Sequence, residues 1–183
     1  MTVKLDATAP TVAYGQVQPR YGILGQIDIT CTAGDALSGL ASTDCEDLNT
    51  QAWTLGAGTT TLTASATDNA GNTTVTSTTF KVTVKPRHLC TLTRRFVRNS
   101  PGYDSLSRYE RRAANTSVRV ACAQLRSIRR WHSPQRIARI VGRYNSTIDG
   151  LVHHGRLSQF DATTLQDLAD AIEPSGPRRG HGG

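Results

Sequence analysis

The chain has 183 residues, of which 37% are hydrophobic and 19% charged, and its formal net charge is +7 at neutral pH. This length suits one domain or two small ones. No apolar run approaches the ~18 residues that a membrane-spanning helix needs, and residues 1–6 lack the apolar core of a signal peptide. We therefore expect a globular chain without a transmembrane segment.

Charge is divided unequally along the chain. Residues 1–85 contain four basic and seven acidic side chains, a net charge of −3. The remaining residues contain seventeen basic and seven acidic side chains, a net charge of +10, and all seventeen basic residues are arginines. This contrast predicts two modules that meet near Lys85-Pro86-Arg87-His88.

The first module, residues 1–85, has the residue pattern of β-strands. Apolar and polar residues alternate over 27–31 with the period of a half-buried strand. Thirteen of the residues 50–84 are Thr, which favours a pleated sheet over a helix. The apolar set changes parity between Val75 and Phe80, which predicts a bulge or a break. Short strands at this spacing predict an all-β sandwich of about seven strands.

Several turn motifs in this module resemble a known family. Asp35-Ala36-Leu37-Ser38-Gly39-Leu40 and Ala66-Thr67-Asp68-Asn69-Ala70-Gly71-Asn72 are similar to segments of bacterial Ig-like repeats from extracellular proteins. The resemblance covers about residues 5–85 and implies an Ig-like β-sandwich. It implies no single activity, because such a sandwich serves as spacer, adhesin or accessory domain.

The second module, residues 86–173, has the period of amphipathic helices. Ser133 and Pro134 predict the start of the longest helix, and Gly155 predicts its end. Residues 174–183 are mostly Gly, Pro and Arg, so we expect a disordered tail. A small all-α helical bundle follows from four expected helices, at 88–98, 116–130, 134–154 and 161–172.

The start of the last expected helix depends on one local pattern. Asp161 is a candidate N-cap, and Phe160 precedes it. We expect Phe160 and Leu165 to form a hydrophobic staple across this cap.

The helical module also resembles a second family. Leu89-Cys90-Thr91-Leu92, Ala121-Cys122-Ala123-Gln124-Leu125 and Thr164-Leu165-Gln166-Asp167-Leu168-Ala169 are similar to FIMAH-like helical modules of secreted bacterial proteins. Those modules stand at the ends of large enzymes and surface proteins. The resemblance implies an accessory segment of a larger parent polypeptide, and a free-standing surface protein is the alternative.

The four cysteines are divided equally between the modules. Cys31 continues an inward-facing strand pattern, and Cys90 and Cys122 lie on or beside apolar helix faces. We predict the disulfides Cys31–Cys45 and Cys90–Cys122, with buried free thiols as the alternative. Paired cysteines predict an oxidising compartment, so the protein is expected to be secreted or on the cell surface.

Motifs of catalysis are missing from the sequence. It has no zinc-protease helix, nucleophile elbow, phosphate-binding loop or dinucleotide fingerprint. His153 and His154 project about 100° apart on a helix, so they cannot face one metal together. We predict no catalytic residue, no enzymatic activity and no cofactor apart from a calcium ion.

Acidic and amide side chains in the turns of the first module form a candidate calcium site. In a sandwich of seven antiparallel strands, the N-terminal segment, the loop after the second strand and the last hairpin turn lie at one pole. Carboxylate and amide oxygens suit Ca²⁺, and Ig-like repeats of adhesins bind it near such junctions. The alternative is turn formation without an ion. The predicted metal ligands are Asp6, Asp35, Asp68, Asn69 and Asn72.

Arginines on the second module form a candidate anion-binding face. Arg136, Arg139 and Arg143 lie within about 60° of one another on a helix, away from its apolar face. A solvated surface of an arginine-biased protein is one interpretation. The other is an anionic partner, since arginine forks suit phosphate and carboxylate groups. The predicted anion-binding residues are Arg126, Arg129, Arg130, Arg136, Arg139 and Arg143.

These patterns predict a non-catalytic binding or spacer segment of a secreted bacterial protein. Its accessory or adhesion role would be to contact the cell envelope or an anionic polysaccharide through the arginine face. The alternative is a nucleic-acid-binding protein that uses the basic helical module.

Overall fold

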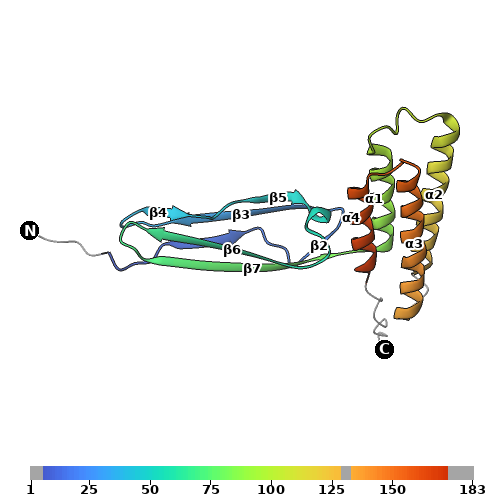
Figure 1. Cartoon of the computed structure of the whole chain (residues 1–183). Helices are drawn as coiled ribbons and strands as arrows, with labels where there is room; N and C mark the ends of the chain where they lie inside the picture. The colour runs from blue at the N-terminus through green and yellow to red at the C-terminus, as the bar shows by residue number, and fades with distance from the viewer. Residues whose placement is uncertain (1–5, 129–132, 173–183) are drawn as a thin grey trace, which may run out of the picture. The chain divides into compact units, whose positions relative to one another are not determined.

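The computed structural model describes residues 6–128 and 133–172. The chain divides into two compact units, which we call the strand unit and the helical unit. Figure 1 shows the strands of the first and the four helices of the second. The strand unit comprises Met1–Tyr21 and Gly25–Val82, and the helical unit comprises Gly22–Leu24 and Thr83–Gly183.

Two sheets build the strand unit. The three-stranded sheet has the order β1-β3-β5, and the four-stranded sheet has the order β2-β7-β6-β4. Pairing is antiparallel between β1 and β3, β3 and β5, β4 and β6, and β6 and β7. The elements are β1 (Thr11–Gly15), β2 (Arg20–Gly22), β3 (Gln26–Gly34), β4 (Leu40–Thr43), β5 (Leu48–Gln51), the 3₁₀ helix η1 (Ala52–Leu55), β6 (Gly58–Asp68) and β7 (Thr73–Thr83).

The predicted fold class, an all-β Ig-like sandwich followed by a small all-α helical bundle, is wrong. A helical turn, Ala52–Leu55, lies among the strands. Gly22–Leu24, from the strand-forming half of the sequence, belongs to the helical unit. The described chain therefore has two sheets, of seven strands in all, with one helical turn among them, followed by four helices.

The bulge or break that the sequence predicts between Val75 and Phe80 is also wrong. The β6–β7 pairing is continuous from Thr67 and Thr73 to Gly58 and Val82, without a bulge. Val75 is 65% exposed, so it lies on the outer face and the inner face at this level carries Thr. A β-branched apolar residue was mistaken for a core residue, because β-propensity does not distinguish the two faces of a sheet.

The core of the strand unit mixes large and small side chains. Ile27 and Ile29 of β3 are buried, as are Ala64 and Ala66 of β6. The alternation predicted for β3 is therefore confirmed at Ile27 and Ile29. Small residues such as alanine bury little apolar area, so this unit gains less from burial than one filled with leucine.

The described part of the helical unit contains four helices. Helix α1 packs against α2 and α4, and α3 packs against α2 and α4. Their bounds are α1 (Pro86–Asn99), α2 (Arg108–Ser127), α3 (Pro134–His153) and α4 (Gln159–Asp170).

Two predicted helix starts are wrong. Helix α2 begins at Arg108, two turns before the expected residue 116, because Ser107 and Glu110 form a reciprocal capping box. Helix α4 begins after Ser158, whose hydroxyl accepts from the Asp161 backbone N–H, so Asp161 is not the N-cap. Phe160 is 75% exposed and forms no staple. In both places a serine caps the helix earlier than the apolar pattern begins.

The helical unit has a core of large side chains with one polar pair inside it. Leu125, Ile148 and Leu165, from three helices, are completely buried. The Tyr144 hydroxyl lies 2.7 Å from Thr93 Oγ1, and both side chains are buried. Burial raises the pKa of Tyr144, so the phenol stays neutral. A satisfied hydrogen bond of this kind fixes the register of α1 against α3.

Two further predictions concern the C-terminal tail and the absence of a membrane-spanning helix. The expected disordered tail, 174–183, lies outside the described residues. None of the described helices is long and apolar enough to cross a membrane.

Candidate functional site

The cysteines pair within each unit as the sequence predicts. Cys31 and Cys45 are bonded with an S–S distance of 1.99 Å, and Cys90 and Cys122 with 2.01 Å. Cys90 and Cys122 are buried and join α1 to α2. No cysteine is left as a free thiol for nucleophilic or metal chemistry.

Three carboxylates from distant segments meet in the strand unit. Asp6 precedes β1, Asp35 follows β3, and Asp68 ends β6. One carboxylate oxygen from each lies within 4.8 Å of the others. We call these three residues the acidic cluster. The separation of 62 residues between Asp6 and Asp68 shows that folding, not local sequence, brings the cluster together.

Backbone hydrogen bonds hold Asp35 and Asp68 in place. Asp35 Oδ1 accepts from the backbone N–H groups of Ser38 and Gly39, each at 2.8 Å. Asp68 Oδ1 accepts from the N–H groups of Ala70 at 2.9 Å and Asn72 at 2.8 Å. Both carboxylates therefore close turns, and each can still offer its other lone pairs.

Two opposing effects set the pKa of Asp68. Asp68 is only 1% exposed. Burial raises the pKa of Asp68, but hydrogen bonds from the Asn72 side chain and from backbone N–H groups outweigh burial, so this pKa lies below its ordinary value. Asp68 is thus ionised at neutral pH.

Asp6 has an unused oxygen. Its Oδ1 accepts from the Thr8 backbone N–H at 2.9 Å. Its Oδ2 is buried and has no hydrogen-bond partner among the residues that the structure describes. Within residues 6–128 and 133–172, no lysine or arginine forms an ion pair with a member of the acidic cluster. Among the described residues, the arrangement therefore concentrates negative charge without a cation to balance it.

Asn69 and Asn72 lie beside the acidic cluster as hydrogen-bond donors. Asn69 Nδ2 donates to the carbonyl oxygen of Ser38 at 2.8 Å. Asn72 Nδ2 donates to Asp68 Oδ2 at 2.8 Å and to the Asp6 carbonyl oxygen at 3.3 Å. These two amides brace the loops that carry the carboxylates, whereas the sequence predicts them as metal ligands.

The predicted arginine face lies partly within the described structure. Arg136, Arg139 and Arg143 are exposed on α3, while the opposite side of that helix buries residues such as Val141 and Ile148. Arg126 is exposed near the end of α2. Arg129 and Arg130 lie outside the described residues. We call Arg136, Arg139 and Arg143 the α3 stripe.

A second group of arginines was not predicted. Arg94 and Arg98 of α1 and Arg119 of α2 line one hollow of about 320 Å³ between these helices. The i, i+4 spacing of Arg94 and Arg98 was readable in the sequence, but the contribution of Arg119 depends on how the two helices pack.

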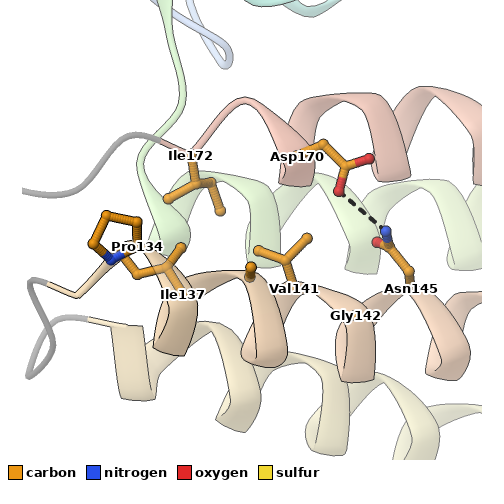
Figure 2. Close-up of a pocket in the computed structure, with 8 residues that line it drawn as sticks. Pro134, Ile137, Val141, Gly142, Asn145, Asp170 and Ile172 are labelled. Carbon is orange, nitrogen blue, oxygen red and sulfur yellow. Dashed lines mark hydrogen bonds between the residues drawn. The ribbon is translucent and has the colours of Figure 1, made fainter.

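A small apolar pocket lies between α3 and α4 (Figure 2). Its volume is about 270 Å³. Asn145 Nδ2 donates to Asp170 Oδ1 at 3.2 Å across its rim, and Asn145 Oδ1 is buried without a partner. Among the lining residues that the structure describes, Asp170 is the only titratable one. The labelled lining residues are Pro134, Ile137, Val141, Gly142, Asn145, Asp170 and Ile172.

Comparison with known proteins adds no family to this geometry. No protein-family model matches the chain, and no curated protein matches its sequence. The features that bear on its function are the acidic cluster, the two arginine groups and the disulfides.

Proposed function

We propose that this chain is a non-catalytic binding or spacer segment of a secreted bacterial protein. It holds its parent protein at the cell envelope, or on another extended anionic polymer, in an accessory or adhesion role. The resemblance of the helical half to modules at the ends of secreted proteins supports this placement.

The disulfides support an extracellular location. Two disulfides, one in each unit, fit an oxidising compartment, because cytosolic reductants keep most thiols reduced. Neither lies in a C-x-x-C motif of the redox-active kind. Both are accordingly assigned a structural role.

The observation that carries the proposed function is the exposure of the α3 stripe. Arg136, Arg139 and Arg143 project from one side of α3, and the opposite side is buried in the helical core. Guanidinium groups are charged at all physiological pH values and form paired hydrogen bonds with phosphate or carboxylate. A row of them suits a polymer that repeats its negative charges.

The alternative partner is nucleic acid. A net charge of +10 beyond residue 85 is typical of a phosphate-binding surface. The disulfides favour the envelope, because nucleic acid is mostly intracellular whereas disulfides persist outside the cytosol. A solvated face with no partner is the third alternative.

Retention of the full chain on two matrices separates these alternatives. Purified bacterial cell wall and duplex DNA are compared at about 150 mM salt, where weak long-range attraction is screened. The proposal predicts retention on cell wall, and a loss of at least about tenfold in the Arg136→Ala, Arg139→Ala, Arg143→Ala variant, since hydrogen bonds to charged groups contribute about 1.5–3 kcal/mol each.

The matched control removes the same charge from exposed arginines of α2. Arg108→Ala, Arg111→Ala, Arg112→Ala should retain most of the binding. Tight DNA binding without retention on cell wall, abolished by the α3 variant, would replace the proposal with the nucleic-acid alternative. Retention on neither matrix would favour the solvated face.

We also propose that the acidic cluster binds Ca²⁺ and so stiffens its end of the strand unit. The buried Asp6 Oδ2 without a partner supports this assignment, because a buried carboxylate oxygen normally has a donor or a cation. Asp35 and Asp68 supply further carboxylate oxygens to the same cluster, and carboxylate oxygens are the ligands that Ca²⁺ prefers. The ion would relieve repulsion among three carboxylates that no arginine or lysine of the described residues offsets.

Thermal unfolding tests the calcium proposal. Free Ca²⁺ at ten times its Kd should stabilise the strand unit by about 1.4 kcal/mol relative to chelator. Asp6→Asn should reduce that calcium-dependent shift, whereas Asp28→Asn, on exposed β3 surface outside the cluster, should preserve it. Equal melting temperatures in millimolar Ca²⁺ and in chelator would refute the proposal.

A further inference from the structure

Arginines surround two neighbouring hollows on the first two helices of the helical unit. Arg94, Arg98 and Arg119, together with Asn115, line the hollow of about 320 Å³ between α1 and α2, and buried Val118 also contributes to it. A second hollow of about 470 Å³ on α1 is lined by Arg94, Arg95 and Arg98, with Thr91 and Asn99. The two hollows share Arg94 and Arg98, so we call them together the α1–α2 arginine groove.

The groove is strongly positive. Neither hollow has a carboxylate in its lining. Among the residues that the structure describes, Arg94, Arg95, Arg98 and Arg119 form no ion pair. Guanidinium groups remain protonated throughout the physiological pH range, so their mutual repulsion cannot be relieved by deprotonation. An anion bound among them would relieve it.

The disulfide and the core fix the spacing across the groove. Cys90 lies four residues before Arg94, and Cys122 lies three residues after Arg119, so the bridge is about one helical turn from the groove on both helices. The Cα atoms of Cys90 and Cys122 are 5.0 Å apart. The helix backbones that carry Arg94 and Arg119 are therefore tied together before any ligand arrives, which reduces the entropy lost on binding.

We infer that the α1–α2 arginine groove binds two adjoining phosphate groups of a phosphate chain. Each hollow takes one tetrahedral group, and Arg94 and Arg98 contact both. Arginine forks can donate to several phosphate oxygens at once, and the Asn115 amide adds an uncharged donor. This inference goes beyond the proposed function, because it rests on α1 and α2 and not on the α3 stripe.

Nuclear magnetic resonance of the full chain tests the site with inorganic pyrophosphate in about 150 mM sodium chloride. The Nε–Hε signals of Arg94, Arg98 and Arg119 should shift in one saturable transition. Orthophosphate, which fills one hollow only, should bind at least about tenfold more weakly, since the second group adds hydrogen bonds to charged donors.

Paired variants locate the site. Arg94→Gln, Arg98→Gln should weaken pyrophosphate binding at least about tenfold, because the two shared arginines are lost. Arg108→Gln, Arg111→Gln removes the same charge from exposed α2 positions outside both hollows and should change the affinity less than about twofold. All four side chains are exposed, and unchanged circular dichroism would verify folding in both variants.

Several results would overturn the inference. Equal weakening in the two variants would show general charge attraction in place of a site. Shifts confined to Arg136, Arg139 and Arg143 would assign the anion to the α3 stripe, which would leave the proposed function standing while the groove fails. No saturable shift at any arginine would also refute the groove.

Discussion

The two units collect charge in opposite ways. The strand unit brings Asp6, Asp35 and Asp68 together from three separate segments. The helical unit spreads arginines over helix surfaces, as along the α3 stripe. Sheet topology therefore gathers carboxylates into one compact cluster, whereas helical periodicity gives extended rows of arginines.

The units also differ in how they are held together. The strand core includes the small residues Ala64 and Ala66 beside Ile27 and Ile29, while the helical core includes Leu125, Ile148 and Leu165. Each unit has one disulfide, spanning 14 residues in the strand unit and 32 in the helical unit. The comparison predicts that different interactions limit the stability of each unit, and the following changes test this.

The largest expected effect comes from removing the disulfides. Loss of Cys90–Cys122 by double substitution to Ala should destabilise the helical unit by about 3.7 kcal/mol, and loss of Cys31–Cys45 should destabilise the strand unit by about 3 kcal/mol, from loop-closure entropy. Urea unfolding followed by signals resolved for each unit measures both. Each variant should destabilise its own unit. If either variant destabilised both units by similar amounts, this prediction would be wrong.

The buried polar pair tests the helical core. Tyr144→Phe removes a hydroxyl 2.7 Å from Thr93 Oγ1 and should cost about 1–1.5 kcal/mol. Thr93 keeps its hydrogen bond to the Leu89 carbonyl oxygen at 2.8 Å, which limits the loss. Thr93→Val combined with Tyr144→Phe should cost less than the sum of the single changes. Strict additivity would show that the two hydroxyls are not coupled.

The capping box of α2 gives a smaller expected effect. Ser107→Ala removes the acceptor for the Glu110 backbone N–H and should destabilise the helical unit by about 1 kcal/mol. Ser105→Ala, in the preceding turn, is the comparison, because its hydroxyl donates only to the Gly102 carbonyl oxygen. Thermal unfolding, monitored by circular dichroism at 222 nm, compares the stabilities of the two variants. An equal effect of both substitutions would argue against the cap.

Lowering the pH should destabilise the strand unit more than the helical unit. Hydrogen bonds from Ser65 lower the pKa of Asp44, and the pKa of Asp68 is also lowered because donors outweigh burial. A lowered folded-state pKa stabilises the fold above the unfolded value of about 4, and that stability is lost as the pH falls through the folded value.

In the helical unit, hydrogen bonds with Ser107 lower the pKa of the Glu110 carboxyl, and burial lowers the pKa of His88. As the pH is lowered from about 5 to about 2, the melting temperature of the strand unit should therefore decrease more than that of the helical unit. Asp44→Asn should reduce the difference between the units. A larger acid effect on the helical unit would contradict the comparison.

Local patterns predicted part of this structure. The period of α3 and its proline start identified both the helix and the exposed arginines of its stripe. The period-two pattern of β3 identified Ile27 and Ile29 as core. These features depend on neighbours in the sequence, and local rules describe them well.

Features that depend on tertiary packing were harder to predict. Val75 has a strand-core residue type but lies on the outer face, and Gly22–Leu24 joins the helical unit from within strand-like sequence. The arginine groove needs Arg119 from a second helix, and the pattern of one helix cannot specify its neighbour. The acidic cluster was predicted only because turn residues at three loops were assumed to share one pole.

The most direct test of an anion-binding helical unit is arginine footprinting of the full chain. A dicarbonyl reagent modifies exposed guanidinium groups, and mass spectrometry measures each site with and without purified cell wall at about 150 mM salt. Protection at Arg139 and Arg143, with Arg20 of the strand unit still reactive, is the predicted result. Unchanged reactivity of Arg139 and Arg143 while the chain is retained on the wall would contradict the account.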